Sequence, residues 1–365
     1  MRLLLALGAA ACLALAPPAF AQDVLGEDSS IVTGAGSTFG FPIVSRWAQS
    51  YRRMIAGGPE LAMAGTGLED PPTRPALAYE PVGSLAGIMR ASNRSVDFGA
   101  TDMPLRSTEL VRLGLAQFPI VIGGVAVVVN LDGVAPGQLK LTGPLLAEIY
   151  LGRVRNWSDA AIRELNPDLR LPEAPIAAVY RSDGSGTTFN FTDFLAKANP
   201  LWRDRVGVDL LVNWPVGVGT GARGNEGVSQ RVRQTKNAIG YVEFAHALKT
   251  RLSYAAIRNQ AGRFVAPGTR AFQAAAAQAP WSGSNDFGLT LTDAPGEHAY
   301  PIVASVFAVV PKATSPRRTR QTLQFFQWAL EKGERDAAEL GYVPLPLSLV
   351  DQIKDYWKRS MLLSG

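Results

Sequence analysis

The feature that most constrains the fold is segment 176–189, where a strand, a turn of small residues and a helix follow one another directly. The run Ile176–Tyr180 is typical of a buried strand, and residues 182–187 are glycine, serine, threonine and aspartate. Apolar residues from Phe191 onward recur at helical spacing. A helix that begins here would point free N–H groups and its positive dipole end at an anion. Arg181 adds a fork of donors that matches an oxyanion, and we expect Asp183 to hold that fork in place.

Two further segments show the same order of elements. Residues 31–39 read Ile-Val-Thr-Gly-Ala-Gly-Ser-Thr-Phe and precede a helical pattern with Pro42 in its first turn. Residues 82–84 read Val-Gly-Ser and precede a short helix, for which Ser84 is the expected N-cap. Each segment alone is better explained as a capped helix after a strand. Three in one chain, one with an embedded arginine, favour a shared anion site.

The first 21 residues predict a cleavable secretory signal peptide. Arg2 precedes an apolar run that ends in Ala-Phe-Ala at Ala21, and the run is short for a membrane span. The only cysteine, Cys12, lies inside this segment, and Ala9 stands where a lipoprotein signal would have leucine. We therefore expect a secreted mature chain without disulfides, whose size allows a large core instead.

Composition excludes few functions but disfavours nucleic-acid binding. A length of 365 residues suggests two domains, and the formal charge of +5 is mild. The basic run 316–320 is more typical of a solvated helix flank than of a nucleic-acid site. A modest positive balance does suit a small anionic ligand.

Strand-like and helix-like stretches alternate along the chain, which predicts an α/β fold with parallel sheets. The expected strands are 96–100, 120–130, 176–180, 238–244 and 301–310. The expected helices are 42–55, 144–150, 159–165, 188–197, 319–332 and 347–360. Residues 63–81 are rich in proline, glycine and alanine and predict an exposed loop.

One long apolar strand, Gln117–Val125, contains the glycine pair 123–124. It is either a core strand or a strand that crosses between two lobes, where glycine permits bending. Residues 300–310 are its expected return partner. If both cross, the first lobe comprises 22–120 plus 298–365 and the second 121–297.

Taken together, the motifs resemble a known family, the periplasmic phosphate-binding proteins of high-affinity phosphate ABC transporters. The resemblance covers nearly all of the chain after the signal peptide. It rests on Thr-Gly-Ala-Gly-Ser-Thr-Phe at 33–39, Val-Asp-Phe-Gly-Ala-Thr-Asp at 96–102, Phe-Pro at 118–119 with Ile-Gly-Gly at 122–124, Ile-Tyr-Leu-Gly at 149–152 with Asn-Trp at 156–157, Arg-Ser-Asp-Gly-Ser-Gly-Thr at 181–187, Trp-Pro at 214–215 and Ala-Ile-Gly-Tyr-Val at 238–242. It implies a two-lobed periplasmic binding protein fold, with the ligand in the cleft between lobes joined by crossing strands.

The resemblance also implies a set of phosphate-binding residues. They are Thr38, the Phe39 backbone N–H, Ser84, Asp102, Arg181, Ser185, Gly186 and Thr187, with Asp183 pairing with Arg181. The chain departs from the family at Gly40, where proline is usual, and at Leu85-Ala86, where Ser-Gly is usual. We expect a periplasmic monomer that delivers phosphate to a membrane permease and ATPase complex, without cofactor, metal or catalytic residues.

A carboxylate in an anion site needs a reason. Repulsion between a buried Asp102 and a dianion would be costly unless the ligand has a proton to donate. Phosphate at neutral pH keeps at least one O–H, whereas sulfate has none. An ionised Asp102 would therefore accept from phosphate and reject sulfate. From its own sequence context alone, Asp102 is better explained as a cap at a strand end.

Three other classes of function are open. A nucleotide-dependent enzyme would use the glycine run 217–222, which fits G-x-G-x-x-A but follows Trp-Pro, and which we interpret as a surface turn. A secreted phosphatase-like hydrolase would use Ser185 or Thr38 with a base, and the two histidines, His246 and His298, are expected to be surface or packing residues. A binding protein for another oxyanion is disfavoured by Asp102.

Overall fold

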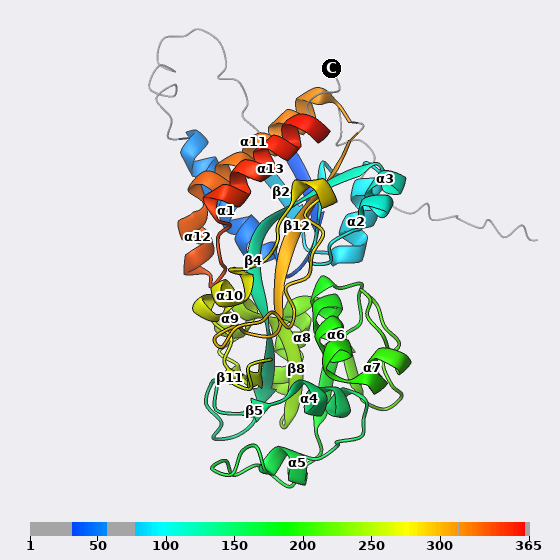
Figure 1. Cartoon of the computed structure of the whole chain (residues 1–365), viewed down its shortest axis with the longest axis vertical. Coiled ribbons are helices and arrows are strands. Elements are labelled where there is room, and N and C mark those ends of the chain that lie inside the picture. Colours follow the sequence, from blue (N-terminus) through cyan, green and yellow to red (C-terminus); the bar gives the residue numbers. More distant parts are fainter. Residues whose placement is uncertain (1–30, 57–76, 313, 362–365) are drawn as a thin grey trace, which may run out of the picture.

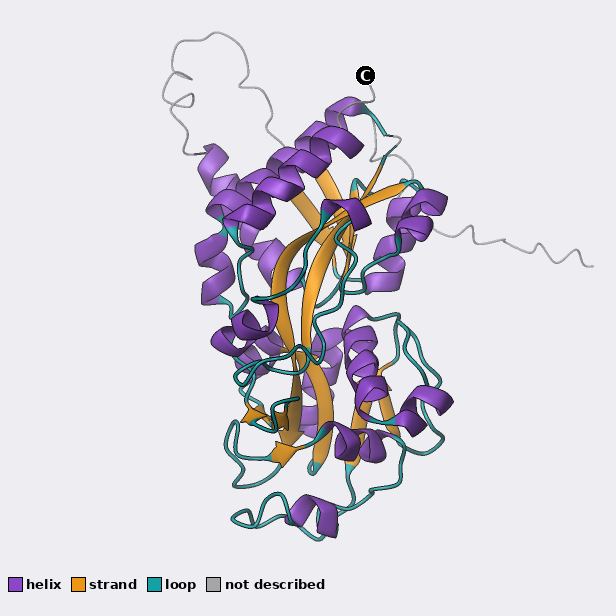
Figure 2. Ribbon diagram, viewed as in Figure 1, coloured by secondary structure: helices purple, strands orange, loops and turns teal. Residues whose placement is uncertain are grey.

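The computed structural model describes residues 31–56, 77–312 and 314–361. The predicted signal peptide 1–21, Cys12, and residues 63–76 of the predicted loop lie outside these ranges. The described chain forms two halves built on one continuous sheet, which runs through both halves with helices on its faces (Figures 1 and 2). The strand order is β2-β1-β3-β12-β4-β8-β6-β7.

The first half of the sheet is formed by both ends of the chain. Strand β1 (Val32–Gly36) lies parallel to β2 (Leu77–Glu80) and to β3 (Phe98–Thr101). Around them lie α1 (Phe41–Ala56), α2 (Ser84–Ser92), α3 (Ser107–Leu113), α11 (Pro316–Lys332), α12 (Glu334–Glu339) and α13 (Leu347–Ser360) (Figure 1). The core of this half is aromatic: the ring of Phe326 packs edge-to-face on Phe98 and on Phe118.

Two long strands connect the halves. Strand β4 (Leu115–Asn130) pairs antiparallel with β12 (Val303–Pro311) from Leu115 to Gly124, and with β8 (Ala238–Glu243) from Val125 onward. Every β4 residue before Asn130 is buried. The predicted crossing strand and its return partner at 300–310 are therefore paired, and the change of partner falls at the predicted glycine pair. These glycines allow close packing, because a Cβ at Gly124 would lie 2.1 Å from the ring of Phe272.

The second half of the sheet comes from the middle of the chain. Strand β6 (Ala177–Arg181) lies parallel to β8 and to the edge strand β7 (Gly219–Ala222). The helices of this half are α4 (Gly143–Tyr150), α5 (Ala160–Arg163), α6 (Gly186–Ala198), α7 (Pro200–Arg205) and α8 (Gly224–Gln234) (Figure 1). Phe191 of α6 stacks on Tyr241 of β8 at 4.1 Å between ring centroids, which fixes the helix against the sheet.

Short elements fill the side of the molecule beside β4. A small sheet of β11 (Phe264–Val265), β10 (Ala256–Arg258) and β5 (Lys140–Leu141) lies there, and β9 (Ser253–Tyr254) pairs with β4. The remaining elements are α9 (Phe244–Thr250), α10 (Thr269–Ala276) and the 3-10 turn η2 (Gly283–Asn285).

The structure corrects two predictions and qualifies a third. Leu77–Glu80 is the edge strand β2 and not part of a loop. Residues 219–222 form the edge strand β7, so only the start of the 217–222 run is a turn. The sheet is parallel among β2, β1 and β3 and among β8, β6 and β7, but antiparallel at the β3–β12, β12–β4 and β4–β8 pairs.

Candidate functional site

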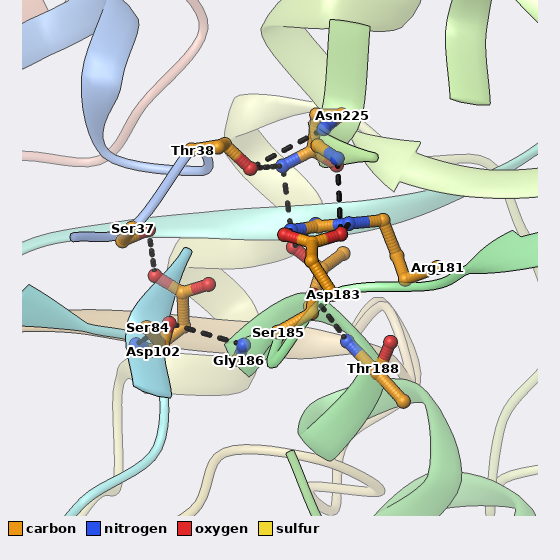
Figure 3. Close-up of polar contacts among 12 residues, drawn as sticks. Ser37, Thr38, Ser84, Asp102, Arg181, Asp183, Ser185, Gly186, Thr188 and Asn225 are labelled. Atoms are coloured by element: carbon orange, nitrogen blue, oxygen red, sulfur yellow. Dashed lines mark hydrogen bonds and ion pairs between the residues drawn. The ribbon is translucent and has the colours of Figure 1, made fainter. Parts of the chain in front are cut away.

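The residues of the predicted anion site meet where the two halves of the molecule face each other. Thr38 and Asp102 follow the carboxyl ends of β1 and β3, and Arg181 ends β6. Parallel strands bring their carboxyl ends to one edge of a sheet, which is where ligands bind in open α/β folds. Figure 3 shows side chains from both halves pointing toward one another across this edge.

Asp102 is buried among donors. Its side chain is 2 % exposed, and its Oδ1 accepts a hydrogen bond from the Ser37 hydroxyl. Burial raises the pKa of Asp102 to about 7; hydrogen bonds from Ser37 and Thr187 and the charge of Arg181 oppose the rise, while Glu243 adds to it. The carboxylate therefore binds a proton near neutral pH or accepts one from a partner. The contacts do not make it a strand-end cap, since Thr101 Oγ1 accepts from the Met103 N–H instead.

Arg181 and Asp183 form the predicted pair. Arg181 is 1 % exposed; its Nε lies 2.7 Å from Asp183 Oδ1 and its Nη2 lies 2.5 Å from Asp183 Oδ2. Burial alone would raise the pKa of Asp183, but hydrogen bonds from Arg181 and its positive charge hold that pKa below its ordinary value. The remaining nitrogen, Nη1, lies 3.4 Å from Thr187 Oγ1. The carboxylate therefore occupies one edge of the guanidinium and fixes its plane.

The helix N-terminus predicted after this turn is present. Ser185 is the N-cap of α6, and its Oγ accepts from the Thr188 N–H at 3.1 Å. Gly186 and Thr187 occupy the first turn, and both are buried. The first turn of α6 lies against Asp102, since a Cβ at Gly186 would be 2.6 Å from Asp102 Cβ, so the positive end of the helix dipole and a carboxylate lie side by side.

Ser84 lies in the site but does not cap α2 as predicted. The N-cap is Gly83, with φ 96°, and Ser84 is the first residue of the helix. Its Oγ instead accepts from the Gly186 N–H at 3.0 Å and from the Asp102 N–H at 3.3 Å. The hydroxyl thus joins the two halves, a role that local sequence could not indicate.

Phe39 directly follows Thr38 of the site. Its ring is buried, and its carbonyl accepts from the Tyr342 hydroxyl at 2.7 Å. Gly40, the departure from the family pattern, donates its N–H to Ser37 Oγ at 3.0 Å, which a proline could not do. At the other departure, the Leu85 N–H donates to the Gly184 carbonyl at 3.2 Å. The Gly40 departure therefore helps to hold the turn after β1 in place, whereas the Leu85 contact is one that a serine backbone would make as well.

Sequence reasoning missed Asn225. It lies in the first turn of α8, is fully buried, and its Nδ2 lies 3.0 Å from Thr38 Oγ1 and 3.2 Å from Thr187 Oγ1. The signal was the same strand, glycine and helix order, here 219–225, but β7 lacks the apolar run that marked the other three strands.

A pocket of about 360 Å³ opens beside these residues. Thr38 and Asp183 lie at its inner wall, and Arg223 and His246 also line it. The site is therefore connected to the surface of the molecule on this side.

The contacts do not assemble a hydrolase. His246 is buried on α9 with Nδ1 3.0 Å from Glu243 Oε2, while His298 is exposed, as expected of packing and surface residues. Ser185 Oγ is bound to a backbone N–H and not to a histidine. Among the described residues, no group of three or more His, Cys, Asp or Glu side chains could hold a metal ion.

Comparison with known proteins identifies the family. The model of the PBP superfamily domain matches residues 23–332. Phosphate-binding protein PstS of Xylella fastidiosa (strain Temecula1) is 47% identical over 327 residues, which are 89% of this chain and 84% of that protein. The chain belongs to the PstS family of the PBP superfamily. PstS of Haemophilus influenzae is 41% identical over 331 residues, 90% of this chain and 93% of that protein.

Solved structures agree with the two-lobed fold of this family. A high-affinity periplasmic phosphate-binding protein (PfluDING), solved with bound phosphate at pH 8.5, gives a TM-score of 0.65 at 21% identity, over 89% of this chain and 93% of that one. A phosphate-binding protein from Stenotrophomonas maltophilia gives a TM-score of 0.64 at 19% identity, over 89% of this chain and 93% of that one. The PstS family is one of transport binding proteins and not of enzymes. No helix in the described ranges is long and apolar enough to cross a membrane.

Proposed function

We propose that this protein binds inorganic phosphate between its two lobes and delivers it to a membrane permease and ATPase complex, without turnover. The observation that carries the proposal is a buried carboxylate, Asp102, in a site that also holds the Arg181 guanidinium, hydroxyl groups and backbone N–H groups. The names of the PstS relatives and the phosphate bound in a structural neighbour support it.

The phosphate contacts in this proposal come from both lobes. The first lobe, 22–120 plus 298–365, supplies Thr38, the Phe39 N–H, Ser84 and Asp102. The second lobe, 121–297, supplies Arg181, Ser185, Gly186 and Thr187, with Asp183 holding Arg181. The proposed boundary at 120/121 lies within β4, four residues before its change of partner at 124/125.

The charges in the site suit an oxyanion that keeps a proton. Arg181 offsets ligand charge, and the hydroxyls and N–H groups donate to bare oxygens. Asp102 accepts the ligand proton or, with a pKa of about 7, shares one with the ligand near neutral pH. A fully ionised oxyanion would leave the carboxylate facing lone pairs, which disfavours sulfate.

The place of action in this proposal is the periplasm. The PstS relatives and the signal-like residues 1–21 support it. The protein would act there as a monomer without a cofactor.

Calorimetry and a phosphatase assay test the proposal together. The purified protein, stripped of ligand, should bind phosphate with one site per chain and should leave a phosphomonoester intact. Absence of phosphate binding, or hydrolysis that persists through further purification, would contradict it.

A further inference from the structure

The amide of Asn225 has one orientation that satisfies its neighbours. Its Oδ1 accepts the Glu243 N–H at 2.9 Å, which places Nδ2 on the opposite side. The two hydrogens of Nδ2 then go to Thr38 Oγ1 at 3.0 Å and Thr187 Oγ1 at 3.2 Å (Figure 3 shows Asn225 above the Arg181 fork). Because a backbone N–H can only donate, the orientation follows from a group that cannot be flipped.

The contacts of Asn225 use up the acceptor capacity of two hydroxyls. A hydroxyl has two lone pairs and one hydrogen. Thr38 Oγ1 accepts from Asn225 Nδ2 and also from the Asn225 backbone N–H at 3.2 Å. Thr187 Oγ1 accepts from Asn225 Nδ2 and from Arg181 Nη1 at 3.4 Å. Each hydroxyl is left with its hydrogen as the only group for a further partner.

Asn225 can direct the Thr38 hydroxyl only when the two halves of the molecule are together. Thr38 belongs to the turn after β1, whereas Asn225 and Thr187 belong to α8 and α6 on the other side. Ser84 Oγ shows the same pattern across the same junction, since it accepts from the N–H groups of Gly186 and Asp102. The Ser84 hydroxyl is directed by backbone N–H groups, whereas the Asn225 side chain directs a hydroxyl in each half and can be altered by substitution.

We infer that Asn225 is a positioning residue that directs the hydroxyl hydrogens of Thr38 and Thr187 into the space that the ligand shares with Asp102. This deepens the proposed function and rests on it. Ligand oxygens at these two hydroxyls must be acceptors, and the ligand's own proton can be received only by Asp102. Asn225 therefore contributes to ligand selection without being one of the donors proposed for phosphate.

Two substitutions of Asn225 distinguish a role in directing the hydroxyl hydrogens from a simple loss of hydrogen bonds. Asn225→Ala removes the two Nδ2 donors, so each hydroxyl keeps one donor, the residue 225 backbone N–H or Arg181 Nη1, and can still donate to the ligand. Asn225→Asp keeps the acceptor for the Glu243 N–H, but its ionised carboxylate accepts only, so both hydroxyls turn their hydrogens away from the ligand. Phosphate affinity measured by calorimetry should fall roughly 3- to 10-fold for alanine and roughly 10- to 100-fold or more for aspartate.

A double-mutant cycle shows whether Asn225 acts through the hydroxyls. In a Thr38→Val, Thr187→Val background, the loss caused by Asn225→Ala should shrink to less than about 2-fold. The matched control is Ser229→Ala, one turn along α8, where the Ser229 hydroxyl donates to the Asn225 carbonyl at 2.8 Å. Its phosphate affinity should stay within about 2-fold of wild type.

The outcomes separate this inference from the proposed function. A wild-type protein that does not bind phosphate contradicts the proposed function itself. A wild type that binds, with equal losses for Asn225→Ala in both backgrounds or no loss at all, overturns the role of Asn225. Circular dichroism checks folding, and if Asn225→Asp does not fold, the alanine cycle alone decides.

Discussion

Arg181 is oriented by Asp183 before any ligand contacts it. Two of its nitrogens, Nε and Nη2, bind the carboxylate at 2.7 and 2.5 Å, in the side-on geometry that suits a planar guanidinium. Holding a long side chain in one rotamer beforehand removes an entropic cost from ligand binding. The site therefore offers its cation in a fixed position.

The first prediction concerns this geometry. Arg181→Lys should weaken phosphate binding by roughly 1.5–3 kcal/mol, because a lysine cannot hold Asp183 and the ligand in the same plane. Calorimetry measures the change, with Arg231→Lys on the exposed face of α8 as the control. Unchanged affinity for Arg181→Lys would mean that the arginine serves the structure and not the ligand.

The second prediction concerns the pH dependence of stability. The pKa of Asp102 is about 7 in the folded protein against an ordinary value of 3.8, so folding favours the protonated form. Its contribution to the free energy of unfolding is fully present below about pH 4 and is lost as the pH rises to about 7. The Asp102→Asn variant has no such proton to lose. Between about pH 4 and pH 7, its free energy of unfolding should therefore rise relative to that of ligand-free wild type by up to roughly 4 kcal/mol.

Urea unfolding of both proteins at several pH values between 4 and 8 measures this gain. Parallel pH profiles for wild type and Asp102→Asn would show that the carboxylate is not held in its protonated form by burial.

The third prediction concerns ligand choice at the same residue. Sulfate in large excess should compete poorly with phosphate for the wild type. The affinity of Asp102→Asn for phosphate should change only modestly. Sulfate should compete with phosphate roughly 10-fold better for this variant than for the wild type, because the amide can donate to a bare oxygen. Competition calorimetry decides, and a variant that excludes sulfate as well as wild type does would remove Asp102 as the selectivity element.

Some residues of the candidate site could be predicted from sequence and others could not. Two features follow from the local order of residues along the chain, namely the pairing of Arg181 with Asp183 and the position of α6. The structure confirms both. Ser84 was assigned the wrong local role because its partners, Gly186 and Asp102, come from elsewhere in the chain. Asn225 was missed for the same reason, since what makes it a site residue is Thr38, 187 positions away.

At the scale of elements, Gly186 marks how closely the two halves approach. A Cβ at this position would lie 2.6 Å from Asp102 Cβ and 2.7 Å from the Asp102 N. Such a distance is too short for non-bonded atoms, so the α6 N-terminus and the turn after β3 can meet in this way only with glycine. The three atoms nearest to that Cβ all belong to Asp102, in the other half of the molecule.

The fourth prediction follows from this contact. Gly186→Ala should weaken phosphate binding by roughly 10-fold or more, because the added methyl group separates the elements that share the ligand. The thermal stability of the ligand-free protein should change little, since the methyl group faces the other half. Gly268→Ala, where the added Cβ meets nothing within 4 Å, is the control. A Gly186→Ala protein that binds phosphate normally would show that this close approach is not needed for binding.

Elements with strong apolar periodicity were predicted well, and weakly patterned ones were not. Helix α13 has the predicted bounds, and α1 and α6 differ from prediction by one or two residues at their ends. Strands β2 and β7 were missed because Leu-Ala-Tyr-Glu and Gly-Thr-Gly-Ala show little alternation. Each is a sheet edge held by pairing with a single neighbouring strand, β1 or β6, and such pairing is a tertiary property.

For the molecule as a whole, the crossing strands determine what can move. Strands β4 and β12 are the long connection between the halves in Figure 1, and the site lies where the halves meet. Direct contacts across the site include the Leu85 N–H to the Gly184 carbonyl at 3.2 Å and Asn190 Nδ2 to the Asp102 carbonyl at 2.7 Å. This arrangement corresponds to a closed form, which a ligand bound by both halves would favour.

The fifth prediction is a change of shape on binding. Small-angle X-ray scattering should give a smaller radius of gyration for wild type with phosphate than without it, and the phosphate-bound curve should match the structure described above. Gly186→Ala should show little compaction at the same phosphate concentration. Identical curves for wild type with and without phosphate would contradict closure by the ligand.

A crystal structure of the phosphate complex tests the central claim most directly, namely that both lobes bind one phosphate through Arg181 and Asp102 together. We expect phosphate oxygens within hydrogen-bond distance of the Arg181 guanidinium, the Asp102 carboxylate and the N–H groups of 186–187, with the Thr38 and Ser84 hydroxyls completing the shell. Phosphate bound at another place, or bound to one lobe with no contact to Asp102, would contradict the account.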